Sequence, residues 1–287
     1  MKTRFFFIFL LIPSFVFAQS GKVLSNLTLT SEILNVKKHY SIYLPPDYET
    51  SERSYPVLYL LHGGGEDHQG WVQFGEVKYI ADKAINDGSA AAMIIVMPDA
   101  ATPQRGYFNW IDGDWLYEDF FFEEFIPYIE TTYRITREKR SRAISGLSMG
   151  GGGTFVYALH HPEMFSSACP LSASSRVLTV EAMKNRPGRF GSVENKPEEE
   201  IQAYIDRYCV HRMIENMPEE QKNEVRWFID CGDDDGLSET NCMLHIAMAK
   251  NEIPHEYRVR DGAHSWAYWR DVLPTVLSYI SVRFHFD

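Results

Sequence analysis

Blocks of apolar and polar residues alternate along this chain, and they predict strands and helices in turn. Residues 55–61 and 92–97 form continuous apolar runs that end just before a Gly or an Asp, which is typical of strands buried on both faces of a parallel sheet. Two extended segments with alternating polarity, residues 23–34 and 38–45, precede these runs and are also strand candidates. Further strand candidates span residues 142–146, 167–171, 225–231 and 255–259.

Between the predicted strands, apolar residues recur at the spacing of one helix face. The clearest helix is predicted over residues 118–133, with Phe121, Phe125 and Ile129 on one side. Strands that alternate with helices indicate an α/β fold, in which helices cover both faces of a mostly parallel central sheet. In such folds the ligand site lies at the carboxyl ends of the strands.

The chain contains no internal repeat and no linker rich in Pro, Gly or Ser, so we expect one domain over residues 19–287. Residues 173–224 interrupt the alternation between two predicted strands. We expect this segment to be an insertion over the carboxyl edge of the sheet. It could serve as a lid or as part of a substrate pocket, and a plain surface elaboration fits the sequence equally well.

The first 18 residues have the form of a secretory signal peptide: a short basic start, an apolar run from Phe5 to Phe17, and Ala18 before the expected cleavage site. The apolar run is too short to span a bilayer, so we expect a secreted or periplasmic protein without a membrane anchor. The four cysteines are too few and too scattered for a disulfide-built fold. The spacing around Cys209 predicts a buried free thiol on a helix.

The strongest chemical signal is the sequence Gly146-Leu147-Ser148-Met149-Gly150, which lies between a predicted strand and a predicted helix. This is the G-x-S-x-G pattern of a nucleophilic serine on a sharp, strained turn. Glycines at the neighbouring positions let the turn form, because a Cβ there would collide with the backbone. Ser148 is therefore the candidate nucleophile.

A serine hydroxyl needs a base to accept its proton, and the base needs a carboxylate to orient it. Among ten histidines, His264 alone follows a predicted strand within a short Gly-bearing loop and opens a helical segment. Three adjacent acids, Asp233, Asp234 and Asp235, follow the strand at 225–231 and are the candidates for the carboxylate. A calcium loop is the alternative for these acids, although the spaced pattern of such loops is missing.

An esterase-type mechanism also needs backbone N–H groups that bind the oxyanion formed on attack. One donor is expected from Met149, which follows the candidate nucleophile. The second is expected from the Gly-rich loop after the strand at 55–61, where Gly64 is the best placed residue. We expect His62, at the start of that loop, to brace the loop rather than to act as a second base.

Several of these motifs resemble those of the Putative esterase family, which groups α/β-hydrolases related to esterase D, feruloyl and acetyl xylan esterases, and enterochelin esterases. The resemblance rests on the loop at 60–65 with Trp71, the turn at 146–151, the acidic segment at 230–237, and the segment 262–266 with Trp269. It implies the α/β-hydrolase fold and a carboxylesterase without a cofactor. Separately, no CxxC or His/Cys spacing in the chain suggests a metal site. The resemblance also implies that Ser148 is the nucleophile, His264 the base, Asp235 the acid, and Gly64 and Met149 the oxyanion donors.

Charge and aromatic content narrow the substrate class. The formal net charge of −11 argues against nucleic acid as a partner, because the protein would repel it. Aromatic side chains expected near the cleft could stack on a sugar or on a phenolic acid; these are Tyr107, Trp110, Trp115, Tyr117 and Trp266. The first hypothesis is hydrolysis of feruloyl or acetyl esters on plant polysaccharide. Siderophore or short-chain acyl esters are an alternative, and a catalytically silent carbohydrate-binding homologue is another.

Overall fold

The computed structural model describes residues 20–101, 106–175, 178–185 and 190–285, and its centre is one eight-stranded sheet. The strand order is β1-β2-β4-β3-β5-β6-β7-β8. Strands β3 to β8 run parallel, whereas β1 and β2 add an antiparallel edge. The strands are β1 (Lys22–Ser31), β2 (Val36–Leu44), β3 (Val57–Leu61), β4 (Ile94–Pro98), β5 (Arg142–Leu147), β6 (Ser167–Leu171), β7 (Arg226–Gly232) and β8 (His255–Arg260).

Every predicted strand is present, and only the boundaries differ. The apolar run at 55–61 enters the sheet two residues late, because Pro56 has no N–H to donate to a ladder. Tyr55 instead forms an isolated bridge with Ile135. The predicted α/β fold class is confirmed.

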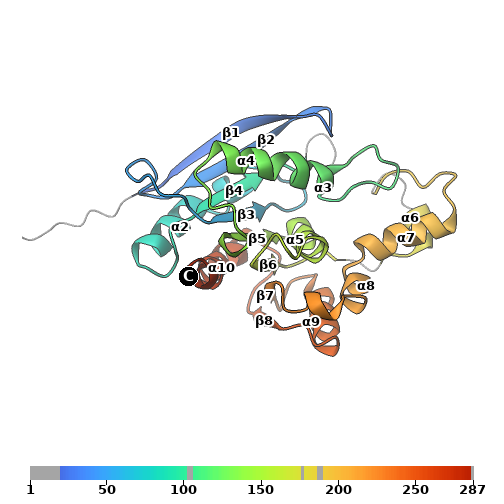
Figure 1. The fold of residues 1–287 in the computed structure, drawn as a ribbon. Coiled ribbons are helices and arrows are strands. Elements are labelled where there is room, and N and C mark those ends of the chain that lie inside the picture. The colour runs from blue at the N-terminus through green and yellow to red at the C-terminus, as the bar shows by residue number, and fades with distance from the viewer. Residues whose placement is uncertain (1–19, 102–105, 176–177, 186–189, 286–287) are drawn as a thin grey trace, which may run out of the picture.

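Helices cover both faces of the sheet, as Figure 1 shows. One apolar core joins the sheet to α4, α5, α8 and α9, and a second joins the opposite face to α2 and α10. The longer helices are α2 (Val77–Asn86), α5 (Met149–His160), α7 (Glu198–Tyr208), α9 (Ser238–Lys250) and α10 (Trp266–His285). The shorter ones are α1 (Gly70–Gln73), α3 (Tyr117–Asp119), α4 (Ile126–Thr132), α6 (Val180–Lys184) and α8 (Val210–Glu215).

The helix predicted over residues 118–133 is helical throughout but not uniformly α-helical. A π-helical segment, Phe120–Phe125, separates α3 from α4. A π turn holds more residues than an α turn and so shifts the phase of the side chains. Phe120, Phe121 and Phe125 are all buried as a result, whereas the simple helical spacing predicted an apolar face with Phe121, Phe125 and Ile129.

The insertion at 173–224 carries α6, α7 and α8, and it packs against the loop that follows β4 (Figure 1). The Tyr204 hydroxyl donates to the Asn109 carbonyl at 2.8 Å, and the Ile111 N–H donates to the Phe190 carbonyl at 2.9 Å. Another contact joins the Tyr208 hydroxyl to the Glu118 carboxylate at 2.6 Å. These contacts hold the insertion beside the carboxyl ends of the strands. Its use as a lid stays a prediction.

All four cysteines are free, and Cys169, Cys209 and Cys231 are buried. The buried free thiol expected at Cys209 is therefore confirmed, although this residue directly follows α7 rather than lying within it. Burial raises the pKa of the Cys231 thiol to about 12. The predicted signal peptide at 1–18 lies outside the described residues. Within those residues, no helix has the length and apolar character needed to cross a membrane.

Candidate active site

Ser148 occupies the sharp turn between β5 and α5. Its backbone angles are φ 54° and ψ −113°, a strained conformation for a residue with a Cβ. This turn can form only because glycines at 146 and 150 leave room for the neighbouring backbone. A Cβ on Gly146 would lie 2.6 Å from the Gly150 carbonyl oxygen, and a Cβ on Gly150 would lie 2.7 Å from the carbonyl oxygens of Leu61 and His62. The predicted strand, turn and helix are therefore present, and the strain is located at the serine.

The structure brings Ser148, His264 and Asp235 together as one chain of hydrogen bonds. The distance between Ser148 Oγ and His264 Nε2 is 2.9 Å. His264 Nδ1 lies 2.8 Å from Asp235 Oδ2 and 3.0 Å from Oδ1. Because a carboxylate only accepts hydrogen bonds, Nδ1 carries a proton and the lone pair of the neutral ring is on Nε2, facing the serine.

Asp235 is almost fully buried and is fixed by its own loop. Its Oδ1 accepts the Leu237 N–H at 2.8 Å, just before α9 begins at Ser238. The ring of Trp269 meets His264 edge to face, with 4.8 Å between centroids. Both side chains therefore have restricted orientations, as a hydrogen-bonded base and its carboxylate require.

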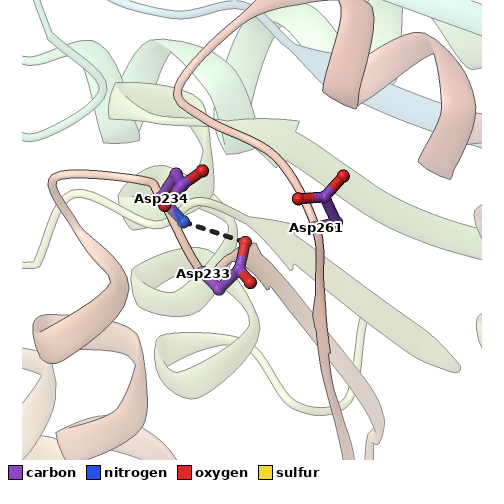
Figure 2. Close-up of side chains that lie close together, drawn as sticks. All are labelled: Asp233, Asp234 and Asp261. Atoms are coloured by element: carbon purple, nitrogen blue, oxygen red, sulfur yellow. Dashed lines mark hydrogen bonds between the residues drawn. The ribbon is translucent and has the colours of Figure 1, made fainter.

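The other two acids of the loop point elsewhere. Figure 2 shows Asp233 and Asp234 beside Asp261, which comes from the loop after β8. All three are exposed. Asp233 Oδ1 accepts the N–H groups of Asp234 and Gly262, both at 3.0 Å, and so ties the two loops together. This carboxylate acts as a turn acceptor. The prediction that this acidic loop is not a metal site stays a prediction.

The two predicted oxyanion donors stand next to the serine. Met149 opens α5 directly after Ser148. A Cβ on Gly63 would lie 2.6 Å from Leu147 Cδ1 and 3.6 Å from Ser148 Cβ, so the Gly-rich loop passes close to the nucleophile. The space around a Cβ on Gly64 is open, which leaves room for a substrate there. The roles of the Met149 and Gly64 N–H groups as oxyanion donors stay a prediction.

His62 is buried beneath the Gly-rich loop as a structural residue. Its Nδ1 lies 2.8 Å from the Gly63 carbonyl oxygen, and its Nε2 accepts the Ala100 N–H at 2.9 Å. Burial lowers the pKa of the imidazole from 6.5 to about 4, so the ring is neutral in the folded protein. Both ring nitrogens are therefore engaged by backbone groups, which fits the expected bracing role.

This burial predicts an acid-dependent loss of stability. Below pH 6.5 the unfolded chain binds a proton at His62 that the folded protein binds only near pH 4, so stability falls as pH drops through this window. We expect the free energy of unfolding to fall about 2 kcal/mol more for the wild type than for His62→Gln between pH 7 and pH 4.5. Urea denaturation at both pH values measures this. Equal losses in the two proteins would show that His62 is not buried in its neutral form.

Three of the aromatic side chains proposed to bind substrate are core residues instead. Trp115 and Tyr117 are 2% and 0% exposed, and Tyr107 is equally buried. The Tyr117 hydroxyl donates to the Asp99 carbonyl, and the Tyr107 hydroxyl donates to the His62 carbonyl. These rings support the loops from below and have no face free for a ligand. Trp110 and Trp266 are partly exposed.

Three tryptophans join the loops that carry the site, through partners that the sequence did not indicate. The Trp71 indole donates to the Leu61 carbonyl at 3.0 Å, and Trp269 donates to Ser172 Oγ at 3.1 Å. Trp266 donates to Glu66 Oε1 at 2.7 Å. The Trp266 ring packs edge to face on both Trp71 and Trp269. Glu66 and Trp266 are 200 positions apart, so no local pattern could have paired them.

Known proteins provide an independent comparison. The model of the Putative esterase family matches residues 31–280. A solved ferulic acid esterase superposes with a TM-score of 0.80 and 37% sequence identity, over 92% of this chain and 100% of that chain. The fold is thus the α/β-hydrolase fold, with its mostly parallel sheet and flanking helices.

Curated relatives match over shorter regions. Esterase Rv1288 of Mycobacterium tuberculosis is 36% identical over 135 residues, which is 45% of this chain and 27% of the relative. The endo-1,4-beta-xylanase/feruloyl esterase of Xylanibacter ruminicola is 34% identical over 149 residues, 50% of this chain and 20% of the relative. The chain thus matches only about a quarter of these longer proteins. From the family match and the solved relative, the chain belongs to the Putative esterase family, a family of carboxylic ester hydrolases with the α/β-hydrolase fold.

Proposed function

We propose that this protein is a serine carboxylesterase in which Ser148 is the nucleophile, His264 the general base and Asp235 its orienting carboxylate. The single observation that carries this proposal is the unbroken hydrogen-bond chain from the buried Asp235 through His264 to Ser148 Oγ. The strained backbone of Ser148 supports it, because such strain is retained where function requires an exposed side chain.

The geometry accounts for acyl transfer to the enzyme. His264 Nε2 accepts the Ser148 proton while Oγ attacks the ester carbonyl carbon, and Asp235 stabilises the imidazolium that forms. The negative charge that develops on the carbonyl oxygen is met by the N–H groups of Met149 and Gly64. His264 then gives its proton to the alcohol oxygen. The carbon–oxygen bond breaks, and the alcohol leaves an acyl-serine behind.

Hydrolysis of the acyl-serine repeats these steps with water. His264, neutral again, takes a proton from a water molecule, which attacks the acyl carbon. The same two N–H groups stabilise the second tetrahedral intermediate, and the proton returns to Ser148 Oγ as the acid is released. The proposed reaction requires no redox step and no cofactor.

We assign the substrates to feruloyl or acetyl esters of plant polysaccharide. The 37% identical relative is a ferulic acid esterase, and a curated relative is a xylanase/feruloyl esterase. The net charge of −11 favours a neutral ester over an anionic one. A polysaccharide substrate fits the export that the first 18 residues predict, since such polymers lie outside the cell.

A substrate panel tests this assignment. Methyl ferulate, acetylated xylan, an aryl acetate and a catecholate siderophore would each be incubated with the protein, and the products would be identified. We expect ferulate or acetate release with the highest kcat/KM, and free acid rather than a new ester as the product. Cleavage of the siderophore alone would contradict the polysaccharide assignment while leaving the triad intact.

Activity is expected to persist without divalent metal. The proposed mechanism uses only the triad and backbone N–H groups, and Asp233 is already engaged as a backbone acceptor. We therefore expect kcat/KM to change less than twofold after dialysis against EDTA. A loss that calcium restores would overturn this expectation and assign a structural role to the cluster of Asp233, Asp234 and Asp261.

A further inference from the structure

We propose that a pocket beside the Gly-rich loop binds one sugar unit of the leaving alcohol, a neutral polyhydroxylated group. The pocket has a volume of about 290 Å³, the low end of the range for small-molecule sites and enough for a single ring. Its walls come from the loop at 65–67 and from α1 with its following residue: Glu66, Asp67, Gly70, Gln73 and Phe74. This inference rests on the proposed esterase function.

The pocket adjoins the Gly-rich loop and is linked to the His264 loop through Glu66. Gly65, one of its lining residues, directly follows the proposed oxyanion donor Gly64. Its Glu66 wall is hydrogen-bonded to Trp266, only two residues after His264. The leaving oxygen takes its proton from His264 Nε2, so the alcohol is next to the His264 loop when the bond breaks. We therefore expect a group attached to that oxygen to extend toward Glu66 and this pocket.

Phe74 provides an aromatic face held in a fixed orientation. The ring is 49% exposed although it is large and apolar. Trp266 supports it from one side, with 6.0 Å between centroids. Its backbone is held at both ends, because its N–H donates to the Gly70 carbonyl at 2.9 Å and its carbonyl accepts from Arg270 at 2.8 Å. A rigid, half-exposed ring suits the C–H face of a sugar, which is apolar.

Polar groups around the ring complement sugar hydroxyls. The Gln73 amide donates one hydrogen to Gln69 Oε1 at 3.0 Å and keeps a second donor and its acceptor oxygen for a ligand. The Asp67 side chain, 47% exposed, offers carboxylate acceptors. The combination of an aromatic face with amide and carboxylate edges matches a ligand that has an apolar face and hydroxyl edges.

The charged groups among the described lining residues of the pocket are acidic. Glu66 and Asp67 both line it. Burial raises the pKa of the Glu66 carboxyl, while the hydrogen bond that the Trp266 indole donates to this carboxyl opposes that rise. Negative charge here would repel a free carboxylate or a catecholate, which favours a neutral alcohol over an anionic acid product.

The experiment compares two esters of the same acid that differ only in the alcohol: methyl ferulate and a ferulate ester of an oligosaccharide. We expect Phe74→Ala to lower kcat/KM for the oligosaccharide ester about tenfold more than kcat/KM for methyl ferulate. Gln73→Ala, at an exposed position that does not threaten folding, should move the same ratio in the same direction. The ratio between methyl ferulate and methyl acetate, which reports the acyl side, should stay within twofold in both variants.

Tyr79→Ala is the matched control, since Tyr79 is another exposed aromatic residue, 67% exposed on α2, away from the pocket lining. It should alter neither ratio. An unchanged alcohol ratio in both pocket variants would overturn the sugar site while the esterase assignment stands. So would a wild-type enzyme that cleaves methyl ferulate but not the oligosaccharide ester. If the wild type cleaves no ester at all, the proposed function fails, and the pocket's role fails with it.

Discussion

Ser148→Ala is expected to lower kcat by a factor of about 10⁶ while the protein stays folded. Comparable serine hydrolases lose activity on this scale when the nucleophile is removed, because no acyl-enzyme forms without attack by Oγ. The Ser148 hydroxyl is half-buried and is hydrogen-bonded to His264, so its loss should leave the free energy of unfolding within about 1 kcal/mol of the wild type. Initial rates on an aryl acetate and a urea denaturation curve measure the two effects.

A fluorophosphonate probe makes this test direct, because it forms a covalent bond with an activated serine. The wild type should be labelled, and Ser148→Ala should not. Ser51→Ala, a change in the loop before β3, is the control and should be labelled like the wild type. Labelling of Ser148→Ala, or turnover within tenfold of the wild type, would show that another group is the nucleophile.

Asp235→Asn is expected to reduce kcat by about 10⁴, the effect of the corresponding change in a serine protease. The amide keeps the size of the side chain and can still accept the Leu237 N–H. It removes the charge that stabilises the imidazolium, and it can hold the ring in the wrong tautomer. The expected signature is a fall in kcat with a much smaller change in KM, measured on methyl ferulate.

The neighbouring acids supply matched controls. Asp233→Asn keeps the oxygen that accepts the N–H groups of Asp234 and Gly262, and Asp234 is an exposed turn residue. Both variants should retain kcat within about threefold, since solvated carboxylates contribute little. If Asp233→Asn or Asp234→Asn were the crippling change and Asp235→Asn nearly wild type, the carboxylate would be misassigned by one or two positions.

Local sequence patterns determined the secondary structure and the candidate nucleophile. The apolar runs that became β3 and β4 carry their burial in their own composition, since strands covered on both faces need no polar side. The turn at Ser148 is equally local, because the glycines at 146 and 150 are required within a few residues of the strained backbone. The phase shift at Phe120–Phe125 was not predictable from spacing, because packing against the sheet selects the π turn.

The partners within the site were decided by the tertiary structure. Composition left three adjacent acids equivalent, and only the resemblance to the family pointed to Asp235. In the structure the course of the loop turns Asp235 inward to His264, while Asp233 joins the neighbouring loop. The tertiary structure also decided which aromatic residues are accessible. Trp115 and Tyr117 are buried in the core, whereas Phe74, which the sequence analysis did not single out, is half exposed.

The sequence by itself determined which chemistry this protein carries, and the tertiary structure decided which residues share it. A strained turn or a buried strand depends on neighbours within a few positions, so a short stretch of consecutive residues is enough to predict it. The hydrogen bond between Trp266 and Glu66, which are 200 positions apart, forms only because folding brings the loop after β3 next to the start of α10. Burial and pairing of this kind arise only when distant elements pack, and no local pattern contains them.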